Sequence, residues 1–358
     1  MKYERANQLQ FWRFLAFLII FQCHASQWAP FQIDNIRALL GVFFFVLLSG
    51  AMSSYALHQK AFRNDSKGIL DHKIKSVIRA YPLYIITNCF TMAYLIPIDL
   101  VTSHSFKDLA KEFINFILTA TMLQPWFLKT ESFNATSWYV ASVSWIGILS
   151  IPVHIFSEKK LGSKRPVILM SILALAGVLY TAIMTFGASY ILKIDITTVP
   201  ILYHPLVLLG LFISGMSLGF IAIILIDRAS ERKTKSSVFT MLEIILTVLW
   251  LSLLFYPSTN IGIFPVLSIV VDYFLILVFI FGRGKLSDLF RLSPLVHLGN
   301  ITFETYLVHQ IIIFAFCFRN GWSSFSRLGN LFALSLCMFV TLVISDFLHS
   351  MVGRRTMK

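Results

Sequence analysis

The chain has 358 residues, of which 57% are hydrophobic and 13% charged, and 34 of them are Phe. Water-soluble proteins carry about 25% charged residues, so this composition excludes an ordinary soluble domain and predicts an all-α polytopic membrane protein. A net charge of +13 could suit a nucleic-acid partner, but the basic residues lie in short loops between apolar segments. Membrane topology explains such a distribution better. We therefore expect the lipid bilayer, and no nucleic acid, among the partners.

Ten segments of the chain are long and apolar enough to cross a bilayer, which takes about 20 residues each. They are 9–27, 36–57, 74–96, 137–156, 166–188, 200–226, 238–256, 260–281, 295–318 and 327–350. An even number of spans places both termini on one side. The loops on that side hold 21 Lys and Arg and the opposite loops hold seven. This asymmetry predicts about ten transmembrane helices with both termini in the cytoplasm of a multi-pass protein of the cell membrane.

The longest connection, 97–136, lies on the predicted outer side. Residues 109–128 within it are apolar but begin with charged residues and end near Pro125, which favours an interfacial or re-entrant helix over a span. Residues 1–358 therefore form a single transmembrane domain without a separate soluble domain. The four cysteines lie in or beside apolar segments and indicate free thiols rather than a disulfide framework.

The first apolar segment contains two polar residues, Arg13 and His24. Eleven positions separate them, which is about three helical turns, so both side chains fall on nearly the same helix face roughly 16 Å apart. Charged groups inside a membrane usually face the interior of a helix bundle and mark a functional site. The alternative is that Arg13 reaches the membrane surface and that His24 merely ends the helix near the lipid headgroups.

Small residues in the second segment include Ser49 and Gly50, which permit close approach of a ligand or, equally, of another helix. In the third segment Arg79 follows Lys73 and Lys75, and together they form a basic cluster. Such a cluster suits the phosphates of a soluble ligand or an anionic lipid headgroup.

Polar residues also occur in the fourth and ninth segments. Trp138 and Ser144 lie in the fourth, where an aromatic belt and a polar cavity are both open interpretations. The ninth contains Glu304, Tyr306 and His309, and Glu304 near mid-membrane must be paired, protonated or solvated. His309 and His24 should lie at similar depth toward the outside, while Arg13 and Arg79 should lie near the cytoplasm.

These motifs, in this order, resemble the membrane acyltransferase-3 family of polysaccharide O-acyltransferases. Arg13 and His24 match its Arg-x10-His helix, and GVFFFVLLSG (41–50) resembles its GV-x-x-FFVLSG segment. RAYP (79–82) resembles its Arg-x-x-Pro, and LGNITFETYLVH (298–309) resembles its LG-x-x-SY-x-x-YL-x-H. SWYVASVSW (137–145) resembles its fourth-helix Trp motif more weakly.

The resemblance implies a transferase that moves an acyl group, commonly acetyl, from cytoplasmic acetyl-CoA or another acyl-CoA to a hydroxyl of a glycan or polysaccharide of the cell envelope. Groups other than amino-acyl groups would be transferred, without a metal, in a bacterial inner or plasma membrane. His24 would be the general base with Arg13 beside it, and Arg79, Lys75, Ser49 and Gly50 would hold the donor. Direct transfer and an acyl-enzyme relay both fit.

The sequence departs from the family pattern at three places. Val143 and Ser144 stand where many members have Glu, Ser76 where many have a second Arg, and Phe43 where Asp is frequent. A divergent branch with its own acceptor would explain this, as would impaired activity. Two other functions remain open, namely a transporter or flippase for a glycan or lipid-linked sugar, and a catalytically silent membrane partner.

Overall fold

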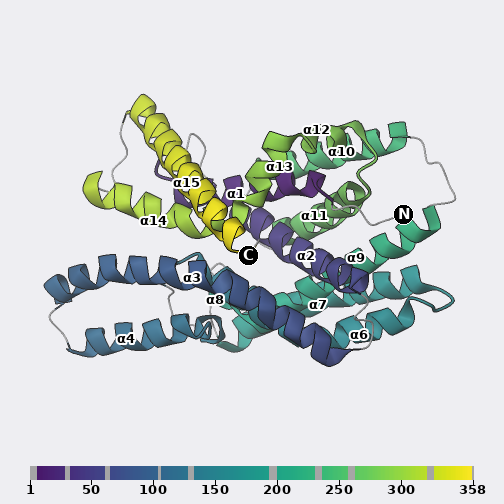
Figure 1. Ribbon diagram of the computed structural model, residues 1–358, viewed down its shortest axis with the longest axis horizontal. Helices are drawn as coiled ribbons and strands as arrows, with labels where there is room; N and C mark the ends of the chain where they lie inside the picture. Colours follow the sequence, from purple (N-terminus) through teal and green to yellow (C-terminus); the bar gives the residue numbers. More distant parts are fainter. Residues whose placement is uncertain are drawn as a thin grey trace.

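The computed structural model describes residues 6–28, 33–60, 65–103, 106–127, 133–192, 200–229, 236–256, 263–320 and 326–356. All regular secondary structure within these ranges is helical, which confirms the predicted all-α class (Figure 1).

Helix α1 (Gln8–His24) packs against five other helices. It contacts α2 (Asn35–Gln59) and α11 (Ile263–Phe281), and also three C-terminal helices: α12 (Lys285–Phe290), α13 (Ser293–Asn300) and α14 (Thr302–Asn320). Its Trp12 is fully buried, and the indole ring meets the rings of Trp250 and Phe279 with centroids 5.2 Å apart. Such aromatic packing fixes the position of α1, and the helix ends at His24.

Glycines allow α2 and α9 (Pro205–Ala229) to pack with their backbones in contact. A Cβ at Gly50 would lie 2.2 Å from the carbonyl oxygen of Phe212, and one at Gly215 would lie 2.2 Å from that of Leu47. The same device joins α7 (Pro166–Leu192) to α9 through Gly177, whose Cβ would clash with the Gly210 carbonyl. Close packing of small residues is how membrane helices gain dispersion contacts.

Two pairs of helices pack beside this core. Helix α3 (Ser66–Ser103) and the amphipathic α4 (Phe106–Ala120) lie side by side and extend to one end of the molecule (Figure 1). Helices α5 (Ser137–Leu149) and α6 (Ile151–Lys160) meet at a 50° bend, where Pro152 lies in the first turn of α6. The described part of 109–128 is thus α4 followed by a 3-10 turn at Gln124–Trp126, and α4 is too short to be a spanning candidate.

The remaining helices are α10 (Ser236–Leu253), α15 (Arg327–Thr356) and the short α8 (Pro200–Tyr203). Three segments predicted to be single helices are broken in the structure. Residues 137–156 divide into α5 and α6 at Ser150, residues 295–318 into α13 and α14 at Ile301, and residues 200–226 into α8 and α9 at His204. Gly299, near the break at Ile301, packs against α1, where a Cβ would lie 2.0 Å from the Gln10 carbonyl oxygen.

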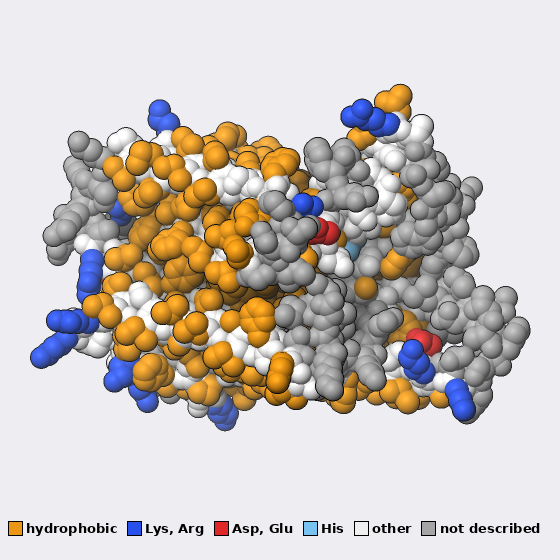
Figure 2. Space-filling model, turned by 180° about the vertical axis from the view of Figure 1, so that it is seen from behind, with side chains coloured by type: hydrophobic (Ala, Val, Ile, Leu, Met, Phe, Trp, Pro, Cys, Tyr) orange, Lys and Arg blue, Asp and Glu red, His pale blue; other side chains and the backbone are white. Residues whose placement is uncertain are grey.

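Six helices in the described ranges are long and apolar enough to cross a membrane, and a seventh results if α5 and α6 form one span. The six are α2, α7, α9, α10, α11 and α15. Hydrophobic side chains cover most of the described part of the face shown in Figure 2, and most of the Lys and Arg side chains lie near its borders. The chain is thus a helical membrane protein. Of the other three predicted spans, α1 has 17 residues, and the parts of α3 and α14 whose side chains the structure describes do not reach the length and hydropathy of a span.

Candidate functional site

A large cavity of 770 Å³ opens between α1, α2, α3 and α5, and we call it the basic cavity. Its basic lining residues are Arg13, Lys73 and His72, and the described residues that line it include no carboxylate. Its polar neutral residues include Ser49 and Ser144. The volume falls within the range of small-molecule and cofactor sites, and the charge favours an anionic ligand.

Lys73 is held inside the basic cavity by contacts from three helices. Its ammonium donates a hydrogen bond to the Ser53 hydroxyl of α2, lies 5.7 Å from the ring centroid of Phe212 on α9, and lies beside Gly147 of α5. Lys73 precedes the predicted span 74–96, and burial lowers the pKa of its ammonium to about 8. At the cavity mouth, burial together with the charges of Lys60 and Lys73 lowers the pKa of His72. The lowered pKa values of Lys73 and His72 indicate a site that is partly desolvated, and that of His72 also reflects the positive charge nearby.

Arg13 enters the same cavity from α1. Its guanidinium donates a hydrogen bond of 2.8 Å to the side-chain oxygen of Gln10, one turn earlier. The hydroxyls of Ser49 and Tyr139 lie 3.2 Å apart, and Ser144 donates to the Val140 carbonyl at 2.7 Å. The predicted site residues Arg13, Ser49 and Ser144 therefore share one cavity.

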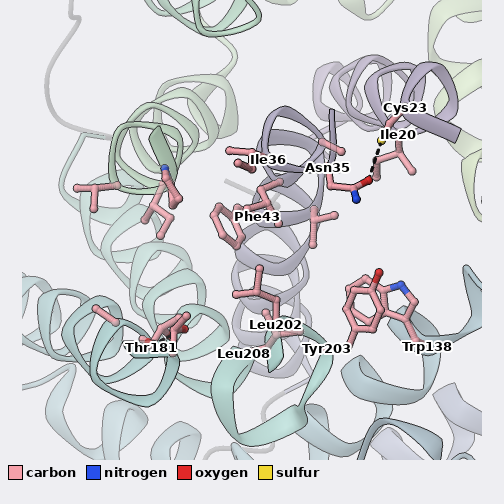
Figure 3. A pocket seen from close by; sticks show the side chains of 18 of the residues that line it. Ile20, Cys23, Asn35, Ile36, Phe43, Trp138, Thr181, Leu202, Tyr203 and Leu208 are labelled. Atoms are coloured by element: carbon pink, nitrogen blue, oxygen red, sulfur yellow. Dashed lines mark hydrogen bonds between the residues drawn. The ribbon is translucent and has the colours of Figure 1, made fainter. Parts of the chain in front are cut away.

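A second cavity of 150 Å³, which we call the apolar cavity, lies between α1, α2, α7 and α11 (Figure 3). His24 and Trp138 line it, together with a largely aliphatic set of residues that includes Ile20, Ile36, Leu39, Val42, Phe43, Val178, Ala182, Leu202, Leu208 and Ile269. Trp138 stacks on Tyr203 with ring centroids 3.7 Å apart, which closes one end. The Arg-x10-His helix thus presents its two polar residues to two different cavities.

Tyr306 lines both cavities and stands between them. Its ring centroid lies 5.6 Å from that of Tyr139 and 6.3 Å from that of Phe45, and the last two lie 6.1 Å apart. We call these three rings the aromatic wall. A ligand that occupies both cavities must pass the aromatic wall.

His24 forms a hydrogen bond with His309 of α14, whose side chain is fully buried. His24 Nδ1 lies 2.8 Å from His309 Nε2, and His309 Nδ1 lies 2.8 Å from the carbonyl oxygen of Tyr306. A carbonyl only accepts, so His309 Nδ1 carries a proton and, in the neutral ring, Nε2 is the acceptor. The hydrogen-bond network therefore assigns the proton of His24 to Nδ1 and leaves the basic lone pair on Nε2.

Five of the sequence-predicted residues lie outside both cavities, and His309 is one of them, because it bonds to His24 without lining either cavity. Arg79 is exposed, and Lys75 forms an exposed ion pair of 2.7 Å with Asp71. Gly50 faces the Phe212 carbonyl of α9, so its small size serves helix packing. Glu304 is buried and pairs with His349 of α15, 2.9 Å away. His349 is thus a partner of the kind expected for a carboxyl group within a membrane segment.

The structure divides the predicted basic cluster of Lys73, Lys75 and Arg79 between two faces of α3. Lys73 lines the basic cavity together with Ser76, Val77 and Ala80, while Lys75 and Arg79 occupy another face. The sequence predicts this division through the helical phase, because Lys73 and Arg79 are six positions and thus about 240° apart around the helix axis. Tyr139 and Phe45 were recognisable only as aromatic residues among many.

No family model matches the chain. No curated protein and no solved structure matches it either. The acyltransferase-3 resemblance therefore rests on the sequence motifs alone. Among the described residues, no group of three or more His, Cys, Asp or Glu is placed to hold a metal ion.

Proposed function

We propose that this protein is an integral membrane O-acyltransferase that moves an acyl group from a coenzyme A thioester to a hydroxyl of a cell-envelope glycan. One observation carries the proposal: Arg13 and His24, on one helix, reach two cavities that share Tyr306. The proposal includes ten membrane crossings with both termini in the cytoplasm, since α1, α3, α14 and the α5–α6 pair add four to the six apolar helices.

The basic cavity is the proposed donor site. Coenzyme A carries phosphates on one end and a flexible, neutral pantetheine arm on the other. Arg13 and Lys73 would bind phosphate oxygens, and guanidinium groups do so through paired N–H donors. The arm would then run along Ser49 toward the aromatic wall.

His24 is the proposed general base. A sugar hydroxyl is a poor nucleophile until its proton leaves, and neutral imidazole accepts protons well near neutral pH. Nε2 of His24 takes the hydroxyl proton as the oxygen bonds to the thioester carbonyl carbon. The carbon–sulfur bond then breaks, and the leaving coenzyme A sulfur receives the proton from His24. His309 keeps the His24 proton on Nδ1 throughout.

Transfer of label from acyl-CoA to glycan in membranes that contain the protein tests this proposal. His24→Asn should reduce transfer by about 10²–10⁴-fold, the usual loss with a general base, while the amount of protein in the membrane stays unchanged. His297→Asn, the same change at an exposed histidine that lines neither cavity, is the control and should remain active. Absence of transfer in the unaltered protein, combined with glycan movement across the membrane, would favour the transporter instead.

A further inference from the structure

The apolar cavity has a composition that does not suit a sugar. Thr181 donates its hydroxyl to the Val207 carbonyl at 3.1 Å, and Thr185 donates to the Thr181 carbonyl at 2.8 Å, so both hydroxyls are already bonded to backbone. The Cys23 thiol donates to the Asn35 side-chain oxygen at 3.4 Å (Figure 3). A sugar buried here would leave most of its hydroxyls without partners, at a large cost in free energy.

The position of the apolar cavity relative to the donor site identifies a different occupant. In an acyl-CoA, the sulfur and the acyl chain leave the carbonyl carbon in different directions. With the pantetheine arm in the basic cavity and the carbonyl near His24, the chain continues beyond the aromatic wall. The space on that side is the apolar cavity, which His24 and Tyr306 both line.

The volume sets the length of the chain. An apolar cavity of about 150 Å³ holds a hydrocarbon the size of benzene, which has six carbons. The volume here is 150 Å³, and an acetyl methyl group would leave most of it empty. An empty apolar cavity forfeits dispersion contacts on all its walls.

We infer that the apolar cavity binds the hydrocarbon chain of the transferred acyl group, and that the donor carries about four to six carbons rather than an acetyl group. This inference rests on the proposed function, since it assigns the chain of the donor whose carbonyl His24 approaches. Each methylene placed in the cavity should tighten binding about fourfold, until the cavity is full.

Binding of acetyl-, butanoyl- and hexanoyl-CoA to the purified protein tests the inference without a glycan acceptor. We expect the Kd of butanoyl-CoA to be at least tenfold below that of acetyl-CoA. Ala182→Phe fills the cavity and should remove this advantage while the Kd of acetyl-CoA stays within about threefold. Ala176→Phe makes the same change on an exposed face of α7 and is the matched control. Val178→Ala enlarges the cavity and should move the preference toward longer chains.

The outcomes separate the inference from the proposed function. Equal Kd values for all chain lengths, or an equal loss for every acyl-CoA in Ala182→Phe, overturn the inference. Labelled transfer in membranes then decides the proposed function independently. Chain-dependent binding without any transfer would retain the cavity assignment and reject the transferase.

Discussion

His24 and His309 join through a single hydrogen bond, with Nδ1 of the first 2.8 Å from Nε2 of the second and the ring planes within 10° of each other. The Tyr306 carbonyl determines the direction of this bond, because it holds the proton of His309 on Nδ1. Phe17 fixes the His309 ring from the side, with centroids 5.3 Å apart. His309 is therefore a positioning residue that selects the tautomer of the proposed base.

The first prediction concerns that tautomer. His309→Gln retains an oxygen that can accept the His24 Nδ1 proton, so kcat should remain within about tenfold of the unaltered value. His309→Leu removes the acceptor and should lower kcat by about 10- to 100-fold, as is usual when an orienting partner is lost. Donor Kd should not change in either variant. If His309 were itself the base, Gln would be as inactive as Leu.

The sequence anticipated the relationship between these histidines but not its contact. Counting residues from the helix ends placed His24 and His309 at one depth, and the rings meet there. The depth of two residues in the membrane does not determine which of their atoms touch, because the contact also depends on the rotation of α14 about its own axis. The sequence predicted one continuous helix over 295–318, whereas the structure breaks it at Ile301, next to the contact between Gly299 and the α1 backbone.

Helical phase separates residues of α3 that charge alone groups together. Lys73, Lys75 and Arg79 form one basic cluster in the sequence, yet only Lys73 turns into the basic cavity. The partner of Glu304 had no comparable signal, since His349 lies 45 residues away on another helix. Gly50 could be interpreted from sequence as ligand-binding or helix-packing, and the position of α9 decides for packing.

The second prediction compares two arginines. Arg13→Ala removes a cation from the basic cavity and should raise the Kd of the donor by about 10- to 100-fold, the range for a hydrogen bond to a charged group. Arg79→Ala changes an exposed side chain outside the cavity and should leave the Kd within about threefold. Titration calorimetry with coenzyme A measures both. A larger loss of donor affinity in Arg79→Ala than in Arg13→Ala would instead place the donor phosphates at the exposed face of α3.

The third prediction concerns topology and follows from the distribution of Lys and Arg. Cysteines introduced at Lys67 and Ser163, in a variant without the four native cysteines, should be shielded from a membrane-impermeant thiol reagent in intact cells. A cysteine at Lys107 should react, because it lies on the opposite side in the ten-span arrangement. Permeabilised cells are the control and should show labelling at all three positions. Labelling of Lys67→Cys in intact cells would exclude cytoplasmic termini.

The last prediction uses the lowered pKa of Lys73. With a pKa of about 8, the ammonium is mostly charged at pH 7 and mostly neutral at pH 9. The charged form attracts the donor phosphates, so donor affinity should be highest below pH 7 and should fall as the pH rises through about 8. His72 should not produce this change, because its lowered pKa leaves it neutral over the whole interval.

Lys73→Arg keeps its charge to far higher pH and should bind coenzyme A equally well at pH 7 and pH 9. Lys73→Gln should bind weakly at both values, because its side chain is never charged. Calorimetry across this interval measures donor binding separately from the chemical step. A decline of the same size in Lys73→Arg would assign the pH dependence to another group and would remove Lys73 from the donor site.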